Sequence, residues 1–170
     1  MKNIELKVNI YNISETLKTL KAIKAKHVGV LKQKDIYYNC VSGRLKLREI
    51  NNKRNELIFY KRPNLNELKI SNYQVVDFNS KNNKSLDFLL STVFGKKNIV
   101  NKERDLWIYK NTRIHIDKVK NLGKFLELET VIKNNDINKA KKEYNELYDK
   151  LNLYKFKKHK ESYSDLLYKK

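Results

Sequence analysis

Two neighbouring segments of the sequence decide the fold: RIHIDKV at residues 113–119 and LGKFLELE at residues 122–129. In each segment charged and apolar residues alternate, and the side chains of a β-strand point alternately to its two faces. Glu127 and Glu129 therefore share one face of the second strand, opposite a face that carries leucines. We expect both segments to form strands that bury one side and present a row of charges on the other.

Charged rows of this kind recur along the chain. They are Glu5 with Lys7, Arg44 with Lys46 and Arg48, Lys102 with Arg104, and Arg113 with His115 and Asp117. In an ordinary one-sided sheet the polar face carries assorted solvated residues. Here the polar faces are chemically biased, and carboxylates are concentrated on only a few of the strands, so the arrangement of these faces in space becomes the central question.

The wider pattern predicts an α+β fold with about eight antiparallel strands. Alternation and turn residues place strands near 3–9, 27–39, 43–50, 56–62, 68–78, 98–110, 112–119 and 123–132. Helical spacing of apolar residues predicts helices after an N-cap at Ser14, at 82–95 and at 136–151. The chain shows no internal repeat and no linker, so we expect residues 1–170 to form one domain.

Two architectures fit a sheet with charged rows. In the first, the sheet is open, its charges face solvent, and its apolar side packs against the helices. In the second, the sheet closes into a barrel whose charged faces point inward, with helices covering parts of the apolar outside. Burying many like charges is costly unless counter-charges neutralise them. A triphosphate held together with divalent metal ions would provide that neutralisation.

The composition excludes several classes of protein. No apolar run approaches the ~20 residues of a membrane-spanning helix. The N-terminus lacks the apolar core of a signal peptide, so we expect a cytoplasmic protein with no membrane partner. Cys40 is the single cysteine, which excludes an intramolecular disulfide framework and a multi-cysteine zinc site. With only four glycines, the chain has no Gly-rich phosphate loop.

The net charge of +19 indicates an anionic partner such as a nucleotide, a polyphosphate or a nucleic acid. Lysine supplies 32 of the 38 cationic residues, and an AT-rich genome would raise the lysine content of any protein. The positions of the cations are therefore more informative than their number.

Several short motifs along the chain resemble, in residues and in order, those of a known enzyme family. The first is Asn3-Ile4-Glu5-Leu6-Lys7. The others are KDIY at 34–37, LKLRE at 45–49, IFYK at 58–61, NKER at 101–104, the two segments quoted above, and SYSDLL at 162–167. Over nearly its whole length the chain resembles the CYTH superfamily of triphosphate tunnel metalloenzymes, and within it the class IV adenylyl cyclase branch. The resemblance implies an eight-stranded antiparallel β-barrel tunnel with covering helices.

The resemblance also implies roles for individual residues. The expected ligands of Mg²⁺ or Mn²⁺ are Glu5, Glu127 and Glu129. The expected catalytic set is Glu5, Lys7, Asp117 and Glu127. The expected phosphate-binding residues are Lys7, Arg44, Lys46, Arg48, Lys61, Lys102, Arg104 and Arg113. Asn3 departs from the family, which has its first Glu at that position. An asparagine offers a carbonyl oxygen to a hard cation but adds no negative charge.

Three functions follow from these observations. By resemblance, the chain is expected to convert ATP to cyclic AMP and pyrophosphate in a cationic tunnel. The alternative is a triphosphatase that hydrolyses inorganic tripolyphosphate, thiamine triphosphate, a nucleoside triphosphate or an RNA 5′-triphosphate end. The third is a basic nucleic-acid-binding protein without catalysis, which would need cations on an outer face. Members of the family are often dimers, so a homodimer is among the expected partners.

A few residues near these motifs have two interpretations. Asp35, beside Tyr37, either orients a base or ribose or is an ordinary acid at a strand end. We expect His115 to make a hydrogen bond in the tunnel or at its rim rather than to act in catalysis. The tail beyond residue 153 is basic, and it carries an apolar patch at Tyr163, Leu166 and Leu167.

Overall fold

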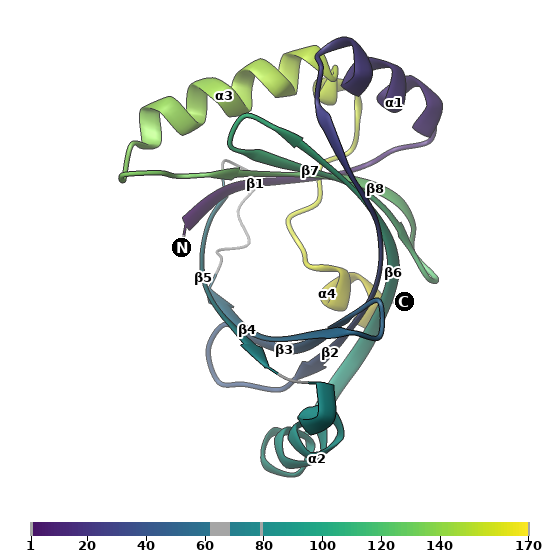
Figure 1. Cartoon of the computed structure of the whole chain (residues 1–170), viewed down its shortest axis with the longest axis vertical. Helices are drawn as coiled ribbons and strands as arrows, with labels where there is room; N and C mark the ends of the chain where they lie inside the picture. The colour runs from purple at the N-terminus through teal and green to yellow at the C-terminus, as the bar shows by residue number, and fades with distance from the viewer. Residues whose placement is uncertain (1, 62–68, 79, 170) are drawn as a thin grey trace.

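The chain folds into a closed β-barrel, and Figure 1 looks through its opening. The structure is a computed structural model and describes residues 2–61, 69–78 and 80–169. Over these residues the strands pair antiparallel in the order β1-β5-β4-β3-β2-β6-β7-β8, and β8 closes on β1. They are β1 (Lys2–Asn9), β2 (Lys26–Tyr38), β3 (Arg44–Ile50), β4 (Arg54–Lys61), β5 (Lys69–Phe78), β6 (Lys96–Tyr109), β7 (Thr112–Val119) and β8 (Gly123–Val131). The barrel is confirmed, and the open sheet is the wrong alternative.

The register of the strands places the charged rows on the inner face of the barrel. Glu127 on β8 lies opposite His115 on β7 and opposite Lys7 on β1. The intervening residues, Leu126 and Leu128, point outward and are fully buried under the helices. Each strand therefore turns polar residues toward the interior and apolar residues toward a covering layer, because its side chains alternate with a period of two.

Two helices cover one side of the barrel, over β1, β7 and β8 (Figure 1). They are α1 (Ile13–Ala22) and α3 (Ile137–Lys150). Their apolar faces and the outward side chains of the strands form the main core, which includes Ile4, Leu6, Val8, Leu20, Ile114, Leu126, Leu128, Tyr144 and Leu147. This core fixes the three strands that carry most of the carboxylates of the interior.

Helix α1 begins earlier than the sequence predicts. Its N-cap is Asn12, whose side-chain oxygen accepts a hydrogen bond from the backbone N–H of Glu15 at 3.3 Å. Ser14 lies inside the first turn, so the predicted cap is wrong. Asparagine and serine cap helices about equally well, and the earlier start brings Ile13 against the core.

The other helices complete the cover. The 3₁₀ turn η1 (Ser80–Asn82) leads into α2 (Asn83–Phe94), on the opposite side of the barrel from α1 and α3 (Figure 1). Helix α2 packs Leu86 and Leu90 against outward residues of β2 and β3. None of the helices in the described part of the chain is long and apolar enough to cross a membrane.

The C-terminal segment returns to the barrel after the short turn η2 (Leu153–Lys155) and ends in α4 (Tyr163–Tyr168). In Figure 1 this segment and α4 lie across the opening. Tyr163 is buried, and Leu166 and Leu167 pack beside it against the barrel. The apolar patch seen in the tail thus packs against the barrel, and α4 lies over part of its opening (Figure 1).

The strand boundaries agree with the sequence to within a few residues. The hairpin between β3 and β4 turns at Asn51 and Asn52, which both have positive φ angles. Asparagine tolerates this left-handed conformation better than most residues. Residues 62 and 68, at the ends of two predicted strands, lie outside the described residues.

Candidate active site

The inner faces of the strands enclose a cavity of about 470 Å³, a volume in the range of small-molecule sites. Among the residues that the structure describes, seven cationic side chains line it: Lys7, Lys46, Arg48, Arg54, Lys102, Arg104 and Arg113. Five carboxylates line it as well: Glu5, Glu56, Asp77, Glu127 and Glu129. Two further carboxylates, Asp35 and Asp117, are fully buried and ion-paired to lining residues. Positive and negative groups therefore balance in number around this cavity.

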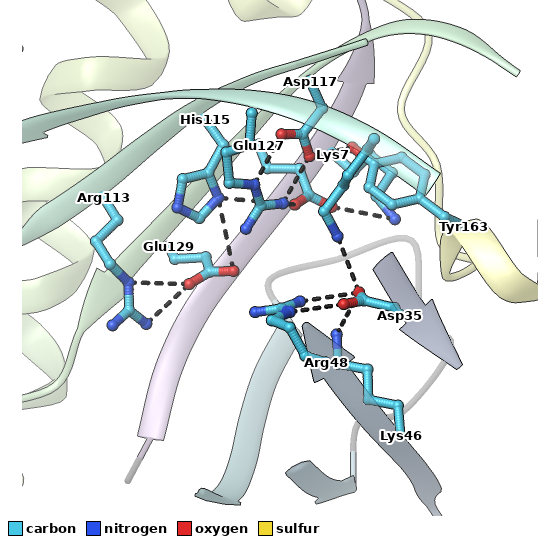
Figure 2. A network of polar contacts seen from close by, with 12 residues as sticks. Lys7, Asp35, Lys46, Arg48, Arg113, His115, Asp117, Glu127, Glu129 and Tyr163 are labelled. Carbon is cyan, nitrogen blue, oxygen red and sulfur yellow. Dashed lines mark hydrogen bonds and ion pairs between the residues drawn. The ribbon is translucent and has the colours of Figure 1, made fainter. Parts of the chain in front are cut away.

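One cluster of charges is centred on Asp35 (Figure 2). This carboxylate is fully buried and accepts hydrogen bonds from Arg48 at 2.7 and 3.0 Å, from Lys46 at 3.0 Å and from Lys102 at 2.9 Å. Asp35 and Arg48 lie directly opposite each other on β2 and β3. The single carboxylate thus faces three cations, and the cluster has an excess of positive charge.

The pKa values in the Asp35 cluster reflect burial and this shortage of negative charge. Burial alone would raise the pKa of Asp35, but Arg48, Lys102 and Lys46 outweigh it and hold the pKa well below its usual range. Burial lowers the pKa of Lys46 to about 7, and repulsion by Arg48 adds to the effect. Burial also lowers the pKa of Lys102. An incoming anion would relieve the repulsion among these cations.

A second cluster lies across β6, β7 and β8. Arg104 forms a two-bond contact with Asp117, at 2.7 and 2.6 Å, and also donates to Glu127 at 2.6 Å. The ammonium of Lys7 lies 3.2 Å from the other oxygen of Glu127. Burial would raise the pKa of Glu127, but Lys7, His115 and Arg104 hold it well below its usual range. Glu127 is therefore an ionised, buried carboxylate.

Glu129 extends this second cluster toward β1. It accepts hydrogen bonds from Arg113, and the two side chains approach to 2.8 Å. Burial opposes ionisation, yet His115 and Arg113 lower the pKa of Glu129 to about 2. Glu5 on β1 lies directly opposite Glu129. Like charges in directly opposed strand positions repel each other, so the pair favours a bound cation.

A group of metal-ligating side chains emerges from this arrangement. One oxygen of Glu127, one oxygen of Glu129 and a ring nitrogen of His115 all lie within 4.8 Å of one another. The Nδ1 atom of His115 is buried and has no hydrogen-bond partner among the residues that the structure describes. Carboxylate oxygens are the ligands that Mg²⁺ and Mn²⁺ prefer. Glu127 and Glu129, with Glu5 lining the same cavity, fit a divalent cation.

Comparison with known proteins identifies the family. The sequence model of the CYTH domain matches residues 1–163. The chain belongs to the CYTH domain family. The members of this family are enzymes of the adenylyl cyclase and triphosphatase types that act on triphosphates, and they depend on metal ions. None of the curated proteins matches the chain.

Solved structures share the fold of this CYTH domain. The PH1012 protein of Pyrococcus horikoshii OT3 is 19% identical, with a TM-score of 0.77, over 96% of this chain and 98% of the other. A proposed adenylate cyclase of Vibrio parahaemolyticus is 17% identical, with a TM-score of 0.77, over 97% of each chain. HpAC1 of Hippeastrum, a proposed adenylyl cyclase described as having a dominant triphosphatase activity, is 11% identical, with a TM-score of 0.65, over 94% and 91%. At these identities the likeness shows the fold alone.

Most of the residues assigned from the resemblance line the cavity of the CYTH domain. They are Glu5, Lys7, Lys46, Arg48, Lys102, Arg104, Arg113, Glu127 and Glu129. Asp117 lies behind Arg104 and is fully buried. Lys61 is exposed at the end of β4, and Tyr60 beside it lines the cavity, so alternation turns Lys61 away from the interior. The structure does not bring Lys61 to the other predicted site residues.

Asn3, where the family has a glutamate, lines the cavity of this CYTH domain and is buried. With its amide oriented to satisfy both neighbours, its oxygen accepts a hydrogen bond from Arg113 at 3.1 Å and its nitrogen donates to the carbonyl of Lys2 at 3.1 Å. The neutral side chain thereby binds the same arginine as Glu129.

Arg44 lies on β3 at the end of the barrel where α4 packs, and it pairs with Asp165 of α4 at 2.8 Å. Lys97 contacts the other oxygen of Asp165 at 3.0 Å, and Ser164 donates to Asn98 at 2.7 Å. These contacts fasten α4 to β3 and β6. Arg44 thus holds the C-terminal helix in place in this structure.

The sequence left Asp35 undecided, and it placed Tyr163 in an apolar patch and in the SYSDLL motif without a role in the site. The hydroxyl of Tyr163 donates to Asp117 at 2.9 Å, and the ammonium of Lys7 lies 3.7 Å from the centre of its ring. Nothing in the spacing of the tail indicates this, because Tyr163 reaches the site only through the return of the chain. For Asp35 the sequence did contain a signal, because residues 35 and 37 are two positions apart on one strand and therefore share a face.

Proposed function

We propose that this CYTH domain is a metal-dependent enzyme that acts on the triphosphate group of a nucleotide inside the barrel. The observation that carries the proposal is the balance of buried charges: Asp35 is shared by three cations, while the cluster of Glu127 and Glu129 is rich in carboxylates. Buried charges are costly without partners. A phosphate chain would bind the cations of the first cluster, and a divalent cation would bind the carboxylates of the second.

The Asp35 cluster supports phosphate binding. Lys46, Arg48 and Lys102 point into the cavity and share a single carboxylate. Charge-assisted hydrogen bonds to phosphate oxygens are about twice as strong as those between neutral groups. Inside the barrel, the three cations would hold the terminal phosphates and stabilise the charge that develops on a leaving pyrophosphate.

The carboxylate cluster supports metal binding. Glu5, Glu127 and Glu129 are the residues that would hold the cation, and Asp117 orients Arg104 beside them. When bound, a divalent metal would supply positive charge that stabilises the leaving group.

An exchange of partners links the two kinds of binding. Lys7 and Arg104 are paired with Glu127, and Arg113 is paired with Glu129. As phosphates enter, these cations can turn from the carboxylates to the phosphate oxygens. The carboxylate oxygens then become available to a divalent cation. We therefore expect the phosphate chain and the cation to bind more tightly together than separately.

The wall of the cavity favours a nucleotide as substrate. Beside the charged groups, β4 and β5 contribute the less polar residues Ile58, Tyr60, Tyr73 and Val75 to the lining. Aromatic and aliphatic side chains of this kind accept the flat face of a base or a ribose. In the cyclase reaction the ribose 3′ oxygen would attack the α-phosphorus and pyrophosphate would leave. Alignment of the attacking oxygen with the breaking bond would be the main contribution of this wall.

Hydrolysis of the terminal phosphate is the second candidate. It needs the same cations and carboxylates, with water in place of the ribose oxygen as nucleophile. HpAC1, a proposed adenylyl cyclase of the same fold, has a dominant triphosphatase activity. Substrates would include tripolyphosphate, thiamine triphosphate and an RNA 5′-triphosphate end. The third reading, a surface for nucleic acids, has less support because Lys46, Arg48 and Lys102 point inward. A cytoplasmic location and a homodimer stay predictions.

Product analysis tests the proposal. The protein is incubated with ATP or tripolyphosphate in Mg²⁺, Mn²⁺ or EDTA, and the products are resolved by chromatography. We expect cyclic AMP and pyrophosphate from ATP, and no product in EDTA. Orthophosphate without cyclic AMP would favour the triphosphatase, and turnover that survives EDTA would overturn the role of the metal.

A matched pair of variants ties that turnover to the cavity. Glu127→Gln removes a carboxylate of the proposed metal site, and a loss of several kcal/mol of charge stabilisation corresponds to at least about 100-fold in rate. Glu103→Gln is the control, because Glu103 pairs with Lys118 and both side chains are exposed. Equal activities of the two variants would exclude Glu127 from the metal site.

A further inference from the structure

His115 occupies an unusual position in the carboxylate cluster. It lies on β7 with its side chain 4% exposed, and its Nδ1 atom is turned toward Glu127 and Glu129 (Figure 2). The nitrogen lies 3.7 Å from an oxygen of Glu127 and 3.8 Å from an oxygen of Glu129. These separations exceed the length of a hydrogen bond. They allow one cation to contact all three groups after a small closure.

The Nδ1 atom has no hydrogen-bond partner in the described part of the chain, although it is fully removed from solvent. A buried polar atom left without a partner destabilises a protein by about 1–3 kcal/mol. Such an atom in a functional cavity indicates a ligand that completes its bonding. The ring nitrogen and one oxygen of each of the two carboxylates lie within 4.8 Å of one another, so a single cation placed between them would bond to all three groups.

We propose that Nδ1 of His115 is a ligand of the divalent cation, together with Glu127 and Glu129, and that this nitrogen makes the site select a first-row transition ion over Mg²⁺. The inference rests on the proposed function, because it assigns a further ligand to the same metal site. A carboxylate set alone would serve Mg²⁺ well. One imidazole ligand changes the preference.

The selectivity follows from ligand chemistry. Mg²⁺ binds oxygen ligands in a near-ideal octahedron and keeps several waters. Imidazole nitrogen suits transition ions, whose affinity for nitrogen and oxygen ligands increases from Mn²⁺ to Cu²⁺. Mn²⁺ accepts both carboxylate oxygen and imidazole nitrogen. Mn²⁺ is therefore the informative probe, because it has the same charge as Mg²⁺ and the comparison depends mainly on whether the ion accepts a nitrogen ligand.

Electron paramagnetic resonance of bound Mn²⁺ tests the bond directly. The chain has three histidines, His27, His115 and His159, and only His115 lines the cavity. In wild-type protein we expect the modulation of a directly bonded imidazole nitrogen in the electron spin echo. Labelling histidine with ¹⁵N should change the frequencies of that modulation. A bound Mn²⁺ without any imidazole signal would overturn the assignment, and this test needs no variant.

Affinity measurements test the selectivity. His115→Asn places an amide near the position of Nδ1, so an oxygen can replace the nitrogen. We expect the affinity for Mn²⁺ to decrease at least about tenfold, since even changes outside the ligand sphere cost 10- to 100-fold. The affinity for Mg²⁺ should change far less. His27→Asn is the matched control, because His27 pairs with Asp105 at 2.7 Å outside the cavity.

The outcomes separate the two proposals. If wild-type protein binds neither Mn²⁺ nor Mg²⁺, with or without tripolyphosphate, the metal-dependent function fails. If both metals bind and His115→Asn leaves their ratio unchanged, the ligand assignment fails while the function stands. Loss of both metals together in His115→Asn, with a melting temperature equal to that of wild type, would also overturn the claim of selectivity.

Discussion

The interior of the barrel contains two clusters with the same number of strong cations and different numbers of carboxylates. Among the described residues of β2, β3 and β6, three cations share Asp35, and Arg48 lies in addition 3.8 Å from Glu56 on β4. Across β6, β7, β8 and β1, three cations share three carboxylates: Lys7, Arg104 and Arg113 with Asp117, Glu127 and Glu129. Glu5, which faces the same side of the cavity, adds a fourth carboxylate to the second cluster.

The difference teaches where each ligand belongs. Burial and repulsion by Arg48 lower the pKa of Lys46 in the Asp35 cluster, and the three cations of this cluster favour an anion. In the second cluster Glu127, Glu129 and His115 bring three metal-ligating atoms close together, which favours a cation. A nearly neutral interior folds more easily than a purely cationic one, because each buried charge has a partner. The same balance makes each ligand depend on the other.

Of the changes that distinguish the two clusters, removal of the Asp35 carboxylate should have the largest effect, and that effect is on the free energy of unfolding. Asp35→Asn leaves three buried cations without their shared carboxylate, and breaking a buried ion pair on one side destabilises by about 3–5 kcal/mol. Urea denaturation would measure this loss in the free energy of unfolding. Tripolyphosphate should restore more stability to the variant than to wild type. The control is Asp105→Asn, at the partly exposed pair with His27; equal stability of the two variants would contradict the role of Asp35.

The coupling between metal and phosphate should be the next largest effect. Isothermal titration of tripolyphosphate with and without Mn²⁺ should show an affinity that is about 5- to 150-fold higher in the presence of the metal. By reciprocity, tripolyphosphate must raise the affinity for Mn²⁺ by the same factor. The physical reason is the release of Glu127 from Lys7 and Arg104 when phosphate takes these cations. Independent binding of the two ligands would refute the exchange of partners.

Lys46 should give the Asp35 cluster a dependence on pH. Its side chain faces Asp35, Tyr37, Arg48 and Lys102, and its pKa of about 7 lies far below 10.5, the ordinary value. The folded state thus binds fewer protons than the unfolded state between these two values, and this group contributes stability that increases with pH there. Phosphate affinity should move the other way, since Lys46 loses its charge above pH 7.

Lys46→Met tests that dependence. One charged hydrogen bond is worth about 1.5 kcal/mol or more, so at pH 6 the variant should bind tripolyphosphate roughly tenfold more weakly than wild type. At pH 9 the two affinities should converge. The titration of the ligand itself is common to both proteins and cancels in the ratio. Lys118→Met, at an exposed position, serves as control; a ratio that is constant with pH would show that Lys46 keeps its charge.

Lys61 should show the smallest effect. The resemblance assigns it to phosphate, whereas its exposed position at the end of β4 lies outside both clusters. Exposed substitutions usually change free energies by no more than about 0.5 kcal/mol, so Lys61→Ala should change the affinity for tripolyphosphate by at most about twofold. A loss as large as that of Lys46→Met at pH 6 would instead support the assignment from the resemblance.

Much of the site was predictable because strands translate sequence into position with a simple rule. Alternation alone placed Glu127 with Glu129, and Lys102 with Arg104, on shared faces. The resemblance of the motifs to the CYTH superfamily then predicted that these strands close into a barrel. Lys61 was assigned to phosphate by the resemblance, and alternation with Tyr60 explains why it points away from the cavity. The cap at Ser14 was misplaced because Asn12 caps a helix about as well as a serine does.

By itself, the sequence determined the alternating strands, the helices, the excess of lysine and the charged rows, because these depend on neighbours along the chain. Only the tertiary structure decided that Asp35 serves three cations, that Tyr163 reaches Asp117, and that Nδ1 of His115 faces two glutamates. The return of the C-terminal segment to the barrel places Tyr163 against Lys7, which lies 156 positions earlier in the chain. Which charges pair with each other depends on distances in the folded chain, and the pattern of neighbouring residues does not contain these distances.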